Sequence, residues 1–261
     1  MSEDFGKDLA KEFVSQTAGK TYDDIAHPTA NATGQLISFI PRTIQVWLRK
    51  WEKWIINGEY SIKETKKLLE KKLANIAEDK ISEPESYVAV PALQQLSYSL
   101  DSEELREMYA NLLASSMNID TKANVHPAFV DIIKQLTPDE AKLLKRISLN
   151  DDEYPLISIH KVNPDRSFNE VMRHFSDIAF EACENPLNIY SYLDNLERLK
   201  LIEIPYDGYL TDEKVYDPLK NHEIVKNITS QILPEGHHWD FAKKYFFLTA
   251  FGKHFVSVYL P

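Results

Sequence analysis

The chain contains little glycine and a single cysteine. Only 7 of its 261 residues are glycine. Cys183 stands alone, which excludes an internal disulfide and a zinc cluster of thiolates and suits a reducing compartment. The first residues, 1–13, are partly acidic and lack the basic start and apolar run of a secretion signal. These absences predict a mainly helical, cytoplasmic protein.

The chain also lacks an excess of positive charge. Its formal net charge is −10, and 26 of its 40 acidic residues but only 17 of its 30 basic residues lie from Asp101 onward. A surface that binds duplex nucleic acid usually carries excess Lys and Arg, which neutralise phosphates. The C-terminal part is therefore a poor candidate for sequence-independent DNA binding.

No arrangement of residues typical of catalysis is found in the sequence. The adjacent His237 and His238 have no further histidine at the helical spacing of a metal pair. His174 and Asp177 would share a helix face, which is more often a solvated contact than a catalytic pair. Acids beside Cys183 disfavour its activation as a nucleophile. No arginine precedes a histidine at the interval found in many helical ribonucleases. We therefore expect no enzymatic activity, no cofactor, no metal and no small-molecule substrate.

Repeated capping signals predict several helices. Ser61 with Glu64 opens a helix with Leu69 and Leu73 in its apolar stripe, and Asp101 with Glu104 opens another. Thr137, Pro138 and Glu140 give the clearest start, because the hydroxyl can accept from an early backbone amide and proline occupies a position that needs no donor. Between two of these helices, the charged stretch 76–91 is interpreted as a connection.

The middle of the chain resembles the abortive-infection alpha family of bacterial proteins, long described as a domain of unknown function. The stretches that carry the resemblance are 104–114, 116–117, 126–130 and 135–141, with weaker likeness at Tyr22–Asp24, Pro28, Gly34, Leu248–Thr249 and Phe251–Lys253. The resemblance implies a role in antiviral defence. It supplies no catalytic or binding residue.

From Thr137 onward, the order of elements changes. A helix from Pro138 to about Leu149 is followed by an apolar strand near Leu156–Ile159, a helix from Phe168 to Ala182, and a helix from Leu187 to Lys200. This part of the chain ends with strands near 201–204 and 245–248 and a last helix. This order is typical of a winged-helix module, with a long insert, 206–241, whose helix has Val225, Ile228 and Ile232 on one side.

The fold expected from these patterns is mainly α. A helical N-terminal region, 1–82, and a helical middle unit, 83–136, precede a winged-helix-like α+β module with a small antiparallel sheet, 137–261. If that module bound DNA, the helix 187–200 would enter the major groove with Asn188, Ser191, Tyr192, Asn195 and Arg198. Its weak basic character favours protein contact instead.

The segment 36–56 offers another contact surface. Trp47, Trp51 and Trp54 lie on it with Arg49, Lys50 and Lys53, as in a helix at a membrane interface, although its charges prevent it from crossing a bilayer. Packing against the rest of the protein is the favoured interpretation. We therefore predict a non-enzymatic defence protein that binds a protein partner or self-associates. A peripheral effector at the inner membrane face and a DNA-binding regulator are the alternatives.

Overall fold

The computed structural model describes residues 67–99, 101–150 and 152–259, all within one compact unit of the chain. The predicted capping box of Ser61 and Glu64 and the tryptophan segment 36–56 lie outside these residues. Of the first predicted helix, residues 67–73 are described as helical, and Leu69 and Leu73 are buried in the core as expected.

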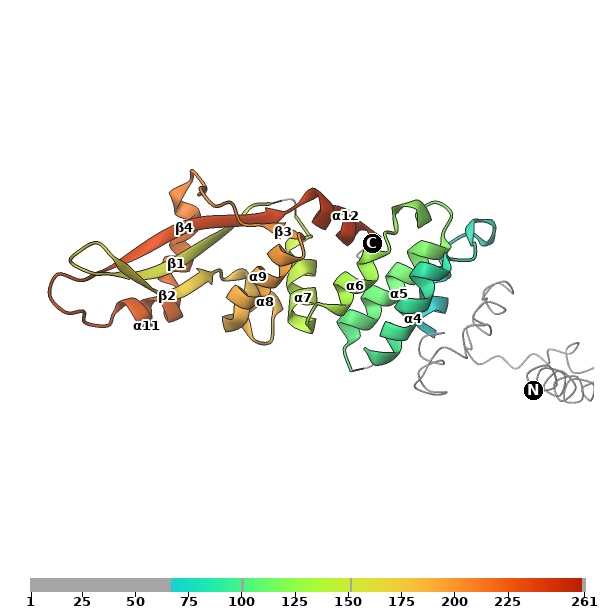
Figure 1. Cartoon of the computed structure of the whole chain (residues 1–261), viewed down its shortest axis with the longest axis horizontal. Helices are drawn as coiled ribbons and strands as arrows, with labels where there is room; N and C mark the ends of the chain where they lie inside the picture. Colours follow the sequence, from blue (N-terminus) through green and yellow to red (C-terminus); the bar gives the residue numbers. More distant parts are fainter. Residues whose placement is uncertain (1–66, 100, 151, 260–261) are drawn as a thin grey trace, which may run out of the picture. The chain divides into compact units, whose positions relative to one another are not determined.

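Helices make up the first part of the described chain. In order these are η3 (Glu78–Lys80), α4 (Ser86–Tyr98), α5 (Glu103–Met117), η4 (Lys122–Asn124), α6 (Ala128–Lys134) and α7 (Pro138–Ile147). Helices α4, α5 and α6 pack side by side (Figure 1). The interpretation of 76–91 as a connection is wrong over its last six residues, because α4 begins at Ser86 and contains Pro91.

The second part combines one sheet with short helices. The strands are β1 (Tyr154–Val162), β2 (Phe168–Phe175), β3 (Ile202–Glu203) and β4 (His238–Leu248), and the helices are α8 (Ile178–Ala182), η5 (Pro186–Asn188), α9 (Ile189–Arg198), η6 (Glu213–Tyr216), α10 (Asp217–Asn221), α11 (Glu223–Thr229) and α12 (Ala250–Tyr259). The strand order is β2-β1-β4-β3, and every neighbouring pair is antiparallel. Helices thus predominate in the described residues, and the second part adds one four-stranded antiparallel sheet.

Helix starts follow from the sequence, with one shift. Thr137 caps α7 through its side chain, and Glu140 returns the bond to the backbone of Thr137, which is the predicted capping box. Helix α5 is capped by Ser102 and not by Asp101, because the Ser102 hydroxyl accepts from the backbone of Leu105. Aspartate and serine are both preferred at the N-cap, so the sequence alone did not decide which of these two neighbours caps the helix.

Strand β2 overturns the predicted helix from Phe168 to Ala182. Apolar residues at Phe168, Val171, Met172 and Phe175 have helical spacing, which explains the error. Pairing with β1 prevails, since a turn at residues 163–167, with Arg166 at a φ of 68°, reverses the chain into a hairpin. Two strands therefore precede α8 and α9, where the prediction had one.

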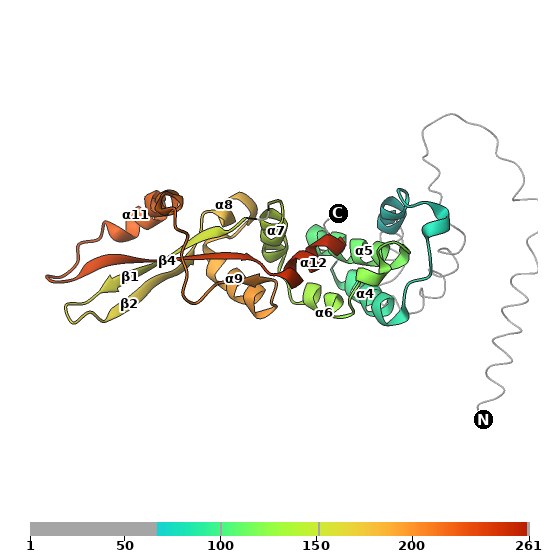
Figure 2. The ribbon, with the colours of Figure 1, turned by 90° about the horizontal axis from the view of Figure 1, so that it is seen from above.

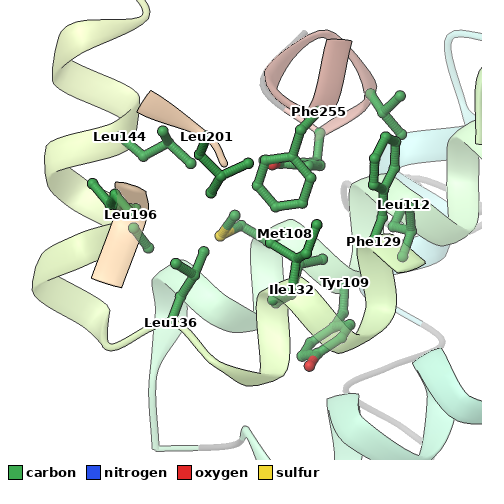
Figure 3. Close-up of a cluster of buried hydrophobic side chains, with 14 of the residues drawn as sticks. Met108, Tyr109, Leu112, Phe129, Ile132, Leu136, Leu144, Leu196, Leu201 and Phe255 are labelled. Carbon is green, nitrogen blue, oxygen red and sulfur yellow. The ribbon is translucent and has the colours of Figure 1, made fainter. Parts of the chain in front are cut away.

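The main core joins both parts of the described chain. It extends from Leu69 to Tyr259 and includes side chains of α5, α6, α7, α9 and α12. Figure 3 shows Phe255 of α12 between Leu201 and Phe129, and the rings of Phe129 and Phe255 meet edge to face with centroids 5.2 Å apart. The last helix is therefore fastened to the middle of the sequence by apolar contact.

A smaller core lies on one face of the sheet. Ile157 and Ile159 of β1 pack with Tyr216, Leu219 and Val225 from the insert. In Figure 2, α11 lies on one side of β1 and β4. The predicted helix of the insert is α11, but it ends at Thr229, and Ile232 lies beyond it, exposed. The face that carries Ser158 and His160 is the opposite one, because side chains alternate along a strand.

Candidate functional site

Asp139 is the polar centre where α7 meets the second part. Its buried carboxylate accepts hydrogen bonds from the backbone N–H groups of Glu184 and Asn185, both at 2.9 Å, and from the Tyr192 hydroxyl at 2.8 Å. Burial alone would raise the pKa of Asp139, but these bonds favour the ionised form, and the net effect lowers the pKa. Asp139 therefore holds α8, η5 and α9 against the start of α7.

Glu140, the next residue, performs a similar task. Its carboxylate accepts from the backbone of Thr137 at 2.7 Å and from the side-chain amide of Asn195 at 2.9 Å. Asn195 also accepts from the guanidinium of Arg198 at 2.6 Å. This stretch of the family resemblance, 135–141, is thus used for folding, since its acids satisfy buried and partly buried donors.

The predicted recognition residues lie on one helix but do not form one surface. Tyr192 is buried against Asp139, and Asn195 is bonded to Glu140 and Gln135. Asn188, Ser191 and Arg198 are exposed. Tyr192 and Asn195 are therefore committed to contacts within the protein, and the exposed Arg198 also donates to Asn195.

Contacts between α5 and α12 use Asn111, which lies in the resemblance, and its neighbour Ser115. The Asn111 amide donates to the carbonyl of Tyr259 and the Ser115 hydroxyl donates to that of Val258, both at 2.7 Å. Thr249 caps α12 by accepting from the backbone of Gly252 at 2.8 Å. A Cβ at Gly252 would lie 1.9 Å from the carbonyl oxygen of Leu201, so only glycine fits there.

A polar pocket of about 350 Å³ lies on the sheet face opposite α10 and α11. Its lining comes from Ser158 and His160 of β1, Phe168, Glu170, Arg173 and His174 of β2, and Ala242 and Lys244 of β4. Strand β2 is bulged here, because Phe175 pairs with Ile157 while Met172 pairs with Ile159. The bulge brings Arg173 and His174 to the same pocket although they are adjacent in sequence.

His174 is the most unusual residue of this pocket. It has a left-handed backbone, with φ 50°, and is only 5% exposed. Its backbone N–H donates to the Ser158 hydroxyl at 3.1 Å, but its Nδ1 atom is buried without a hydrogen-bond partner. The predicted pairing of His174 with Asp177 on one helix is wrong, because His174 belongs to β2 and Asp177 precedes α8.

The charges around His174 give the pocket its electrostatic character. Burial, reinforced by the positive charges of Arg173 and Lys244, lowers the pKa of His174 to about 4, while Asp194 and Glu170 act in the opposite direction. Arg173 lies 3.6 Å from Asp194, and the His160 ring lies 3.6 Å from Glu170. At neutral pH the His174 ring is uncharged. Within the described chain, no hydrogen bond joins it to the Ser158 hydroxyl, so the two do not form a nucleophile and base.

An apolar groove of about 310 Å³ runs between β2 and the start of α9. It is lined by Glu170, Val171, Met172, Arg173, Phe175, Leu187, Ile189 and Tyr190. Three of its apolar side chains remain accessible: Val171 is 48% exposed, Leu187 56% and Tyr190 48%. The residues of the groove and of the polar pocket were mostly missed in the sequence, because their grouping depends on the β1–β2 hairpin.

A larger cleft of about 730 Å³ lies among the helix at 67–73, α5, α7 and α12. Its charges are largely paired across it, since Lys72 contacts Glu107 and Lys142 contacts Glu104 at 3.4 Å. Charges of both signs therefore line this cleft, with no clear preference for an ion of either sign.

The other sequence candidates have structural explanations. Burial and the nearby Asp139 raise the pKa of Cys183 to about 11, so the thiol stays protonated at neutral pH. The direction agrees with the prediction, but burial is the main cause. In residues 67–99, 101–150 and 152–259, no group of three potential metal ligands gathers. Within the same ranges, no helix has the length and hydropathy to cross a membrane.

Comparison with known proteins identifies one family and one distant structure. The family model described as abortive infection alpha matches residues 57–259. None of the curated proteins matches the chain. A solved structure of an uncharacterized protein from the hydrocarbon-degrading marine bacterium Alcanivorax borkumensis SK2 aligns with 51% of the chain and 92% of its own length, at 16% identity and a TM-score of 0.35. That likeness is too distant to carry an argument.

Proposed function

Because the chain belongs to the abortive infection alpha family, we propose that it is a bacterial antiviral defence protein that acts by contact with another protein and not by catalysis. The family match supports the role in defence.

The apolar groove between β2 and α9 carries this proposal. A folded protein normally buries large apolar side chains, whereas Val171, Leu187 and Tyr190 are about half exposed at one groove. Aromatic and aliphatic side chains grouped in this way are typical of the centre of a protein interface. The flanking Glu170 and Arg173 would form part of a polar rim.

Simple addition of a partner strand to β2 is disfavoured. Strand β2 is an edge strand, but its pairing with β1 has two irregularities, between Ile157 and Ile159 and between Ile159 and His160. Bulges of this kind twist an edge away from regular pairing. The partner would therefore contact side chains of the groove and not extend the sheet.

The winged-helix alternative is less well supported. Helix α9, which corresponds to the predicted recognition helix, has Tyr192 and Asn195 engaged inside the protein. The exposed Leu187 of η5 and Tyr190 of α9 lie at or just before its start. Arg198 is the single basic residue of α9. Phosphate contacts normally need several such residues. The membrane alternative rests on Trp47, Trp51, Trp54, Arg49, Lys50 and Lys53, which lie outside the described residues, and it stays a prediction.

A phage challenge of bacteria that produce the chain tests the proposal. Tyr190→Glu places a charge in the groove, and the matched control, Tyr209→Glu, places the same charge at an exposed tyrosine away from it. We expect Tyr190→Glu to restore phage plating to the level of cells without the chain, because burying an unpaired charge in an interface is costly. Tyr209→Glu should protect like the wild type.

Sedimentation of the purified proteins identifies the occupant of the groove. If the wild type is an oligomer that Tyr190→Glu dissociates, then the partner is a second copy of the chain. If both are monomers, the partner is a different protein. Circular dichroism and expression level must match between the two variants. Full protection by a folded Tyr190→Glu protein would contradict the proposal.

A further inference from the structure

We propose that the polar pocket around His174 is a binding site for a small phosphate ester that carries a planar ring, such as a mononucleotide. This site is separate from the protein contact proposed above, although Glu170 and Arg173 line both cavities.

The pocket is lined by a buried histidine, His174, that has one ring nitrogen without a partner. The Nδ1 atom of His174 is inaccessible and makes no hydrogen bond within the described protein, and the Asp194 carboxylate lies 4.0 Å away. An unsatisfied buried polar atom is costly and uncommon. It is held here by a bulge and a left-handed backbone, which are themselves typical of functional positions.

Two cations favour an anionic ligand. Arg173 and Lys244 reach the pocket from β2 and β4, and they face it together with Glu170, His160 and His174. Arg173 is already 3.6 Å from Asp194, but both side chains are about half exposed, and a pair of this kind is weak enough to rearrange around a ligand. Arginine and lysine suit a phosphate because the first supplies a planar fork of donors and the second a compact charge.

An exposed ring supplies the second half of the site. Phe168 stacks on His160 with centroids 4.2 Å apart and an angle of 15° between the planes. Phe168 nevertheless remains 57% exposed, so its other face is open to a planar group. Stacking of a nucleobase on an aromatic side chain is favourable for every base. The cavity of about 350 Å³ is within the range of small-molecule sites.

Titration calorimetry of the full chain with AMP, adenosine and inorganic phosphate tests this inference. We expect AMP to bind with a Kd below about 1 mM and the two fragments to bind at least about tenfold more weakly, because each makes only part of the contacts. Lys244→Gln should weaken AMP binding at least about tenfold by removing a charge-assisted hydrogen bond. Lys244 does not line the apolar groove, so this result is independent of the proposed protein contact.

A matched control removes the same charge from the other face of the sheet. Lys161 lies next to His160 on β1 but outside the pocket. The Lys161→Gln protein should therefore bind AMP like the wild type. Nuclear magnetic resonance of the His174 ring gives a second readout, since a bound phosphate should raise the pKa of His174 from about 4.

Several results would overturn the site. Absence of AMP binding, or equal affinity of the wild type and Lys244→Gln, removes the role of the cations. Equal affinity for AMP and inorganic phosphate removes the role of Phe168. Equal affinity for AMP and adenosine would show that the phosphate group contributes nothing to binding. If Lys161→Gln lost as much affinity as Lys244→Gln, the loss would result from the change in net charge and not from a contact in the pocket.

Discussion

Asp139→Asn should destabilise the protein strongly although it changes only one atom of the side chain. Both carboxylate oxygens accept hydrogen bonds: one from Glu184, the other from Asn185 and Tyr192. An amide has a single acceptor oxygen, so in either orientation its NH2 group faces a backbone N–H that loses its acceptor. Such an unsatisfied, partly buried donor costs about 1–3 kcal/mol, and the bonds to a charge are lost as well. We expect the free energy of unfolding to fall by about 3 kcal/mol.

A double-mutant cycle with Tyr192→Phe locates the effect. The Tyr192 hydroxyl lies 2.8 Å from Asp139, and its removal alone should cost about 1.5 kcal/mol, as for a hydrogen bond to a charged group. In the Asp139→Asn background the same change should cost about 1 kcal/mol less, because its partner is already weakened. Urea unfolding followed by circular dichroism at neutral pH measures all four proteins.

The control is Asp152→Asn, which makes the same substitution at an exposed position ahead of β1. Its free energy of unfolding should stay within about 0.5 kcal/mol of the wild type. A loss below about 1 kcal/mol in Asp139→Asn, or purely additive effects of Asp139 and Tyr192, would refute the view that this carboxylate holds α8, η5 and α9 to α7.

Two further predictions concern the backbone and pH. Gly252→Ala should lower the free energy of unfolding by about 3 kcal/mol, measured in urea, because its Cβ would lie 1.9 Å from the Leu201 carbonyl oxygen. The control, Ser257→Ala on the exposed side of α12, should leave this free energy nearly unchanged. An equally small effect of Gly252→Ala would contradict the close approach. The buried, neutral His174, with its pKa lowered to about 4, stabilises the fold above the unfolded pKa of about 6.5, and this stability is lost as the pH falls from there toward 4. Between pH 7 and pH 5 the free energy of unfolding of the wild type should fall by up to about 2 kcal/mol more than that of His174→Asn. Asparagine is chosen because it tolerates the left-handed backbone at this position. Equal losses in the two proteins would contradict the burial of a neutral histidine.

Local signals in the sequence predicted local structure well. The Thr137–Glu140 capping box, the strand at Leu156–Ile159 within β1 and the last helix all follow from residues next to one another, which compete with few alternatives. The error at 168–182 has a physical reason. Four apolar residues with helical spacing were placed in a strand by the hairpin with β1, and two of them, Phe168 and Val171, are exposed.

The candidate sites were less predictable because they are assembled from distant segments. Lys244 reaches the pocket of Ser158 and His174 through the β1–β4 pairing, whose register no local pattern specifies. The groove likewise joins Val171 to Leu187 and Tyr190 across α8. A turn signal was present, since Asn163-Pro164-Asp165 follows an apolar run, and it could have indicated the hairpin.

Photo-crosslinking in infected cells tests the proposed protein contact most directly. Benzoylphenylalanine is placed at position 190 in the groove or, as a control, at the exposed position 209. We expect one discrete protein adduct from position 190 and none of that mass from position 209. Absence of an adduct at position 190 in cells that remain protected, or the same adducts from both positions, would contradict it.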